Sequence, residues 1–170
     1  MGRSSAYPDR SMESFLHLSV GGFTERVAAR TPAPGGGAVA AVTAASAAAL
    51  VAMAARFTDW PAGPAEKLRA RLEPLADADA AAYTEVLASY RLPKDDPLRR
   101  GRINEALRVA TEVPREVATA ARAVAVLADD LVERGNRNLV GDARVAALLA
   151  RAAAEAAEEL VAINERAARR

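Results

Sequence analysis

The chain has 170 residues, with 23 basic and 22 acidic side chains for a net charge of +1, and it has no cysteine and one histidine. Its length is that of one domain with a sizeable core, its scattered basic residues do not indicate nucleic-acid binding, and disulfides or thiolate and histidine-cluster metal sites are excluded. Half the residues are hydrophobic, much of that alanine, and only 4% are aromatic, which favours an all-α domain packed through small side chains.

The amino-terminal segment 1–10 lacks the apolar core of a signal peptide, so we expect a cytoplasmic protein that begins with a disordered arm. Ser11 can cap a short leader helix that carries Met12, Phe15 and Leu18. Gly21 and Gly22 interrupt this pattern, which resumes over 23–30 before T-P-A-P ends it. We therefore divide the chain into an arm with its leader helix, 1–18, and a single helical domain, 19–170.

Three consecutive glycines, Gly35, Gly36 and Gly37, follow Pro34 and open an uncharged run over 38–55. This pattern predicts a flexible turn that leads into a long helix. The start of a helix has unpaired N–H groups and the positive end of the helix dipole, so an anion could bind beside the glycines. The alternative interpretation is that the glycines only form a tight turn.

The helix expected after these glycines should be central to the fold. Gly37, Ala41, Ala45 and Ala49 recur every four residues and form a ridge on which another helix can pack closely. The run also reaches the lower length limit of a membrane span. Alanine gains little from transfer to lipid, however, and no basic cluster precedes the run, so the sequence favours a buried helix and no membrane contact.

The next predicted helix starts after Pro64 and runs from about Ala65 to Tyr90. Asp79 lies inside its apolar stripe, where burial would raise the pKa of the carboxyl group toward the range useful for proton transfer. An equally good interpretation is a buried hydrogen bond or salt bridge that fixes helix packing. Asp77 points to the opposite face. The apolar stripe consists of Leu68, Leu72, Leu75, Tyr83, Val86 and Tyr90 around Asp79.

The second half of the chain predicts three further helices. Asp96 and Pro97 open a helix over 98–113, and Pro114 should kink or restart it before 115–134. The segment 135–142 then leads into a final helix that ends near Ala168. Its expected apolar stripe consists of Val145, Leu149, Ala152, Ala156, Leu160 and Ile163. The sequence thus predicts an all-α bundle of about five long helices and one short leader.

No phosphate loop, dinucleotide fingerprint, nucleophile elbow or metal-binding helix motif occurs in the sequence. What remains is the glycine turn and a set of polar side chains in the helical domain. These residues indicate a small anionic ligand at the glycine turn, but they do not identify a reaction. The polar set is Asp79, Lys94, Asn136, Asn138, Asp142 and Asn164.

Several short motifs occur in a fixed order between Val20 and Asn164. They are T-P-A-P-G-G-G-A, D-A-D-A-A-A-Y followed by Y-R-L-P-K, V-P, G-N-R-N with a following aspartate, and A-I-N. In this order and spacing they resemble the cyclodeaminase/cyclohydrolase family of folate enzymes, which contains methenyltetrahydrofolate cyclohydrolases and formiminotetrahydrofolate cyclodeaminases. The resemblance implies an all-helical homodimer that binds a tetrahydrofolate derivative near the glycine turn.

The resemblance also implies roles for particular residues. Asp79 matches the acid/base position, and Asp77 is a second catalytic candidate. Both family reactions pass through a tetrahedral carbon that bridges N5 and N10 of the folate, so one carboxyl group suffices and no cofactor or metal is required. The candidate folate-binding residues are Gly35, Gly36, Gly37, Lys94, Asn136, Asn138, Asp142 and Asn164, and cationic side chains or glycine amides among them could bind the folate's glutamate tail.

One departure from the family pattern leaves an alternative open. The interval between Phe57 and Asp77 is shorter than expected by roughly three helical turns, about 16 Å along a helix axis. If that interval formed a wall of the folate pocket, the chain would be a non-catalytic folate-binding protein or a structural helical dimer. The sequence does not distinguish water from ammonia chemistry, since both use the same intermediate.

Overall fold

The structure is a computed structural model that describes residues 14–169. Over these residues the chain is all-helical and contains no strand, as predicted. The expected arm over 1–10, the Ser11 cap and Met12 lie outside the described residues. In chain order the elements are the 3-10 turn η1 (Phe15–His17), α1 (Val20–Ala28), α2 (Gly36–Arg56), α3 (Gly63–Leu72), α4 (Leu75–Tyr90), α5 (Arg99–Arg134), the 3-10 turn η2 (Arg137–Leu139) and α6 (Val140–Ala168).

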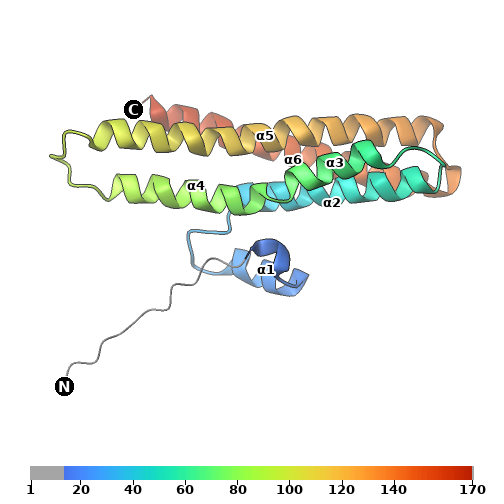
Figure 1. Cartoon of the computed structure of the whole chain (residues 1–170), viewed down its shortest axis with the longest axis horizontal. Helices are drawn as coiled ribbons and strands as arrows, with labels where there is room; N and C mark the ends of the chain where they lie inside the picture. Colours follow the sequence, from blue (N-terminus) through green and yellow to red (C-terminus); the bar gives the residue numbers. More distant parts are fainter. Residues whose placement is uncertain (1–13, 170) are drawn as a thin grey trace, which may run out of the picture.

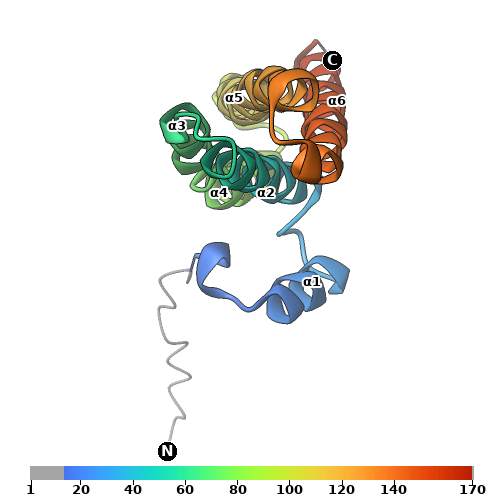
Figure 2. The ribbon, with the colours of Figure 1, turned by 90° about the vertical axis from the view of Figure 1, so that its right-hand side faces the viewer.

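Helices α2 to α6 form an elongated bundle, and α1 lies beside it on a separate connector (Figure 1). Viewed along the bundle, α2 lies between the pair α3 and α4 on one side and α6 on the other, with α5 above it (Figure 2). Helix α2 contacts each of the other four bundle helices, and α5 packs along α6. The glycine-headed helix is therefore central, as the sequence indicates.

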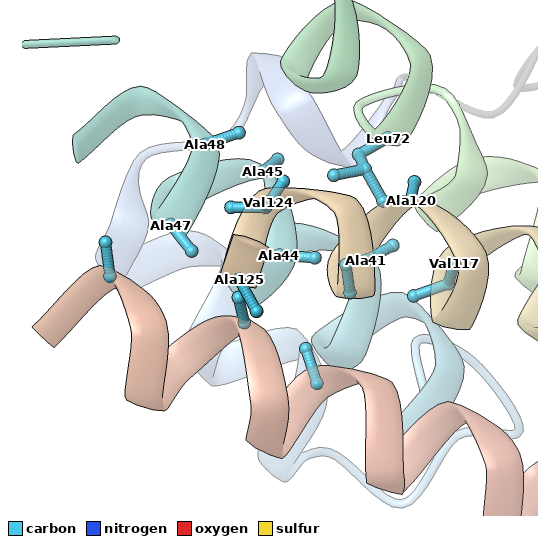
Figure 3. Close-up of a cluster of buried hydrophobic side chains, with 14 of the residues drawn as sticks. Ala41, Ala44, Ala45, Ala47, Ala48, Leu72, Val117, Ala120, Val124 and Ala125 are labelled. Atoms are coloured by element: carbon cyan, nitrogen blue, oxygen red, sulfur yellow. The ribbon is translucent and has the colours of Figure 1, made fainter. Parts of the chain in front are cut away.

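The core around α2 consists mainly of alanine. Small side chains on three helices meet there, which lets the backbones approach closely (Figure 3). Gly37, Ala41 and Ala45 of the expected ridge are buried, whereas Ala49 faces outward. Among the described helices α2 alone is long and apolar enough to cross a membrane, with a mean hydropathy of 2.0, but 61% of that window is buried inside the molecule. Such burial is typical of the core helix of a bundle.

Two predicted helix boundaries are wrong, and both involve proline. The single helix expected over 65–90 is two helices, because Pro74 has no N–H and its ring crowds the preceding turn, so α3 ends at Leu72 and α4 begins at Leu75. Conversely, α5 continues through the buried Pro114 without a restart. Near the amino terminus, Gly21 and Gly22 lie in the first turn of α1, which Ser19 caps, and do not interrupt it.

The prediction of which face of the last helix is buried is also wrong. The buried face of α6 consists of alanines, while Val145 is 48% exposed and Ile163 45% exposed. A helix packed against the small side chains of α2 and α5 has room for alanine and not for larger residues, so periodicity of large side chains identifies the wrong face. The buried residues are Ala143, Ala146, Ala147, Ala150, Ala153, Ala154 and Ala157.

Candidate functional site

A cavity of about 310 Å³ lies at the amino-terminal end of α2. Its walls consist of the connector before α2, the start of α2, and the facing sides of α4, α5 and α6. Every long helix except α3 therefore contributes residues to the cavity. Its polar side chains are an aspartate, a tyrosine and an asparagine, and the rest of its lining is apolar or glycine. The lining residues are Pro32, Ala33, Gly35, Gly36, Gly37, Asp79, Tyr83, Val86, Ala110, Pro114, Leu160, Ile163 and Asn164.

The Asp79 carboxyl group lies directly against the first turn of α2. It accepts a hydrogen bond from the backbone N–H of Ala38, one of the N–H groups that a helix start leaves unpaired. A Cβ atom built on Gly37 would lie 2.7 Å from Asp79 Oδ2 and closer still to Oδ1 and Cγ, so the carboxyl group occupies the space that a side chain would take. The protein's own aspartate therefore lies against the glycine turn, where the sequence indicates an anionic ligand.

Burial raises the pKa of Asp79 above its ordinary value, and the hydrogen bond from Ala38 opposes that shift only in part. The carboxyl group is half-buried in a largely apolar cavity, where its charged form loses hydration. A raised pKa brings the group closer to the neutral range in which one carboxyl can both accept and release a proton.

The raised pKa of Asp79 gives a pH-dependent contribution to stability. Between the unfolded pKa of about 3.9 and the higher folded pKa, the folded chain holds a proton that the unfolded chain has lost, so stability falls as pH rises through this window. The Asp79→Asn substitution removes this effect. We expect the free energy of unfolding of the variant, relative to the parent protein, to increase with pH across the window and then level off. Urea titrations at a series of pH values measure it, and a difference that stays constant or decreases would contradict the shift.

Asn164 of α6 lines the cavity, and a hydrogen bond defines the orientation of its amide. Its Nδ2 donates to the carbonyl oxygen of Ala110 in α5 at 2.9 Å. Within a regular helix that carbonyl would accept from the N–H of residue 114, which is a proline and has none. From the sequence, Pro114 is expected to kink or restart the helix; in the structure its missing N–H leaves an acceptor for a side chain of the cavity.

The structure places the other predicted site residues away from the cavity. Lys94 is exposed in the connector between α4 and α5. The Nδ2 of Asn136 donates to the carbonyl oxygen of Phe57, just past the far end of α2, and a helix of 21 residues is about 30 Å long. Asn138 and Asp142 lie in the same region, in η2 and the first turn of α6. These three residues therefore lie about one helix length away from the glycine turn.

Asp77, the second catalytic candidate, lies on the opposite side of α4 and does not line the cavity. Its Oδ1 accepts a hydrogen bond of 2.9 Å from the backbone N–H of Phe15, and the Phe15 ring is buried in the core. The Phe15 ring also packs edge-on against Phe23 of α1, with 6.1 Å between ring centroids. The carboxylate thus anchors η1 to α4, a structural role that the sequence does not indicate.

We expect Asp77→Ala to weaken this anchor without removing the cavity. Loss of one partly buried hydrogen bond should lower the free energy of unfolding by about 0.5–1.5 kcal/mol, while the arrangement of Asp79, Gly37 and Asn164 remains. Urea unfolding and turnover measured on the same preparation separate the two effects. A loss of turnover as large as that of an Asp79 variant would show that Asp77 takes part in catalysis.

The sequence analysis did not identify Tyr83 or the apolar side chains that form the walls of the cavity. Tyr83 follows Asp79 by one helical turn on the predicted stripe, and that spacing could have identified it. Leu160 and Ile163 come from the face of α6 that was expected to be buried. Within the described part of the chain, no residue between Phe57 and Asp77 lines the cavity.

The chemistry of this cavity follows from its few polar groups. One carboxyl group can carry a proton, a phenol and a carboxamide can orient a ligand, and the N–H groups of Gly36 and Gly37 have no partner four residues earlier in the helix. Among the lining residues there is no lysine or arginine, so the cavity suits a reacting group that is cationic or neutral. Within 14–169, no group of three or more acidic or histidine side chains could hold a metal ion.

Comparisons with known proteins show to which family the chain belongs. A family model described as formiminotransferase-cyclodeaminase matches residues 19–169. The chain is 34% identical over 159 residues to the methenyltetrahydrofolate cyclohydrolase of Methylorubrum extorquens, covering 84% of this chain and 76% of that protein. It is 34% identical over 158 residues to the formimidoyltransferase-cyclodeaminase of Mus musculus, covering 82% of this chain but only 29% of that protein. The crystal structure of formiminotetrahydrofolate cyclodeaminase from Thermotoga maritima has a TM-score of 0.79 at 33% identity, covering 89% of this chain and 80% of that chain.

Proposed function

Because the chain belongs to the formiminotransferase-cyclodeaminase family, we propose that it acts on a tetrahydrofolate derivative as a methenyltetrahydrofolate cyclohydrolase or a formiminotetrahydrofolate cyclodeaminase. The observation that carries this proposal is the position of Asp79, a carboxyl group with a raised pKa in a cavity that also contains the glycine turn and Asn164. The relatives that match along most of this chain are named for these two activities.

In the cyclohydrolase reaction, water adds to the methenyl carbon between N5 and N10. The Asp79 carboxylate accepts the proton that the water loses on addition, and it returns a proton to N5 as the bond between that nitrogen and the carbon breaks. The proton of the remaining hydroxyl group is released to solvent as the formyl carbonyl forms. The formyl group then remains on N10. The methenyl bridge carries a positive charge, so a carboxylate in a cavity without lysine or arginine stabilises the bound substrate as well.

In the cyclodeaminase reaction, N10 adds to the carbon of the formimino group on N5, and ammonia leaves. With the formimino group bound in its protonated form, the Asp79 carboxylate accepts the proton that N10 loses and then gives it to the departing nitrogen. Both reactions pass through a tetrahedral carbon between the same two nitrogens, so the same carboxyl group serves either. The raised pKa of Asp79 supports both roles, since each requires a change of protonation within one turnover.

We include in this proposal a homodimer located in the cytoplasm. Helix α1 has no buried residue, and Val20 on it is 84% exposed. On α6, Leu148 is 66% exposed beside Val145. Large apolar side chains exposed in this way are typical of surfaces that a partner covers, and sedimentation equilibrium of the purified protein distinguishes a dimer from a monomer. In such a dimer, a second copy could bring Asn136, Asn138 or Asp142 near a bound folate.

A spectrophotometric assay tests the proposed function. The purified protein is given 5,10-methenyltetrahydrofolate, and formation of the 10-formyl compound is followed; in a second assay it is given 5-formiminotetrahydrofolate, and ammonia release is followed. We expect turnover with one of the two substrates. Binding of a reduced folate without turnover of either would instead support the non-catalytic folate-binding protein, and absence of binding would support a structural dimer.

A further inference from the structure

The carbonyl oxygen of Ala110 is an acceptor that its own helix leaves without a donor. Residue 114 is a proline inside α5, so the N–H that would bond this oxygen is missing. Ala110 and Pro114 both line the cavity, so this part of α5 borders the region where the folate is expected. The Nδ2 of Asn164 takes the place of the missing donor at 2.9 Å.

This hydrogen bond determines which end of the Asn164 amide is available to a ligand. A carbonyl oxygen can only accept, so the amide must direct an N–H group toward Ala110 and its oxygen elsewhere. No residue between 14 and 169 donates to that oxygen, and no buried side-chain oxygen in this range is left without a partner, so the oxygen of this cavity-lining residue is accessible from outside the protein core.

We propose that Pro114 is a positioning residue that fixes the Asn164 amide oxygen as the acceptor for N–H donors on the pteridine ring of the folate. The inference rests on the proposed function. In 5,10-methenyltetrahydrofolate neither N5 nor N10 carries a hydrogen, so the N–H groups of its pteridine are those of the cyclic amide, the amino group and the reduced ring. The remaining N–H belongs to the glutamate amide at the other end of the molecule. An acceptor with a fixed direction selects such a ring and contributes to binding more than to the chemical step.

Three variants test this positioning. Asn164→Ala removes the acceptor and the donor, Asn164→Asp keeps the shape but cannot donate to Ala110 when ionised, and Pro114→Ala supplies the missing backbone N–H. We expect both Asn164 variants to raise KM for methenyltetrahydrofolate about 10- to 100-fold, with kcat within threefold of the parent. Pro114→Ala should raise KM about three- to tenfold, because the new N–H competes for the Ala110 carbonyl and frees the amide to turn. Pro97→Ala, in the exposed connector before α5, is the matched control and should leave KM unchanged.

The double variant Asn164→Ala/Pro114→Ala tests most directly whether the two residues act together. Once Asn164→Ala has removed the amide, Pro114→Ala has nothing to release, so it should raise KM no further. Additive effects, or a KM unchanged by Pro114→Ala alone, would overturn the proposal. If Pro114→Ala does not fold, Asn164→Asp decides: a KM equal to that of the parent would show that donation to Ala110 is not needed.

A measurement without substrate separates this inference from the proposed function. We expect the side-chain amide protons of Asn164 to exchange slowly with water in the parent protein and faster in Pro114→Ala, as observed by nuclear magnetic resonance. Equal exchange rates would overturn the positioning role even in an active enzyme. The exchange rates could differ as expected while the parent neither binds 5-formyltetrahydrofolate nor turns over either substrate. In that case the proposed function fails, but the effect of Pro114 on the orientation of the Asn164 amide is confirmed.

Discussion

Replacement of Asp79 by asparagine should lower kcat about 10²- to 10⁴-fold while the protein stays folded. The amide has the shape of the carboxyl group, and its oxygen can still accept the hydrogen bond from Ala38, so the contact with α2 is kept. It cannot take up or release a proton. Because burial disfavours the charged carboxylate, the neutral amide should leave stability at neutral pH equal or higher.

The experiment measures turnover, binding of 5-formyltetrahydrofolate and thermal unfolding on the same variant. We expect lost turnover, binding within a few-fold of the parent, and an unchanged or higher unfolding temperature. An active Asp79→Asn variant would remove this residue from the mechanism. A variant that unfolds would favour the purely structural interpretation, in which the carboxyl group only fixes the packing of α4 on α2.

Replacement of Gly37 by alanine should have the second large effect, because the new methyl group needs the space of the Asp79 carboxyl group. The added Cβ would lie 2.7 Å from Oδ2 and closer still to Oδ1 and Cγ, so either α4 or the carboxyl group must move. Overpacking of this kind lowers stability by about 1–3 kcal/mol. A displacement of the proton carrier by about 1 Å can lower turnover about 10²-fold. Urea unfolding and kcat measured on Gly37→Ala test both effects.

The neighbouring glycine provides the matched control. A Cβ on Gly36 would meet only Leu160 Cδ1, at 4.0 Å, so Gly36→Ala should fold with Asp79 in place. A double variant separates the steric cause from a general effect on the helix: in an Asp79→Ala background the carboxyl group is gone, and Gly37→Ala should no longer lower stability. An equal loss of stability in both backgrounds would show that the clash with Asp79 is not the cause.

The part of the site that could be predicted from sequence is the part determined by local spacing. Helical periodicity places Asp79 on the cavity-facing side of α4 and Asp77 on the opposite side, and the uncharged run after the glycines predicts the central helix. That Gly37 lies against Asp79 could not be predicted from spacing, because the two belong to different helices and their contact depends on how α4 packs across α2. The structure therefore gives the third glycine a specific steric partner, whereas the sequence indicates a flexible turn, a possible anion site and a ridge for close helix packing.

The other differences have related physical causes. Pro74 ends a helix while Pro114 does not, and the difference lies in tertiary contacts, since Asn164 supplies a donor to the carbonyl that Pro114 leaves unpaired. The face of α6 was mispredicted because its partners offer space only for alanine. Asn136, Asn138 and Asp142 share motifs with the family but lie at the far end of α2, and position along the sequence does not reveal that separation.

The central claim is that a reduced folate binds in the cavity with its reacting carbon beside Asp79. The most direct test is a crystal structure of the Asp79→Asn variant with 5,10-methenyltetrahydrofolate, in which slow turnover should preserve the ligand. We expect one water molecule to bridge the substituted side chain and the reacting carbon. We also expect the pteridine ring to donate a hydrogen bond to the amide oxygen of Asn164. A folate bound at any other place on the chain, with this cavity holding only solvent, would contradict the account.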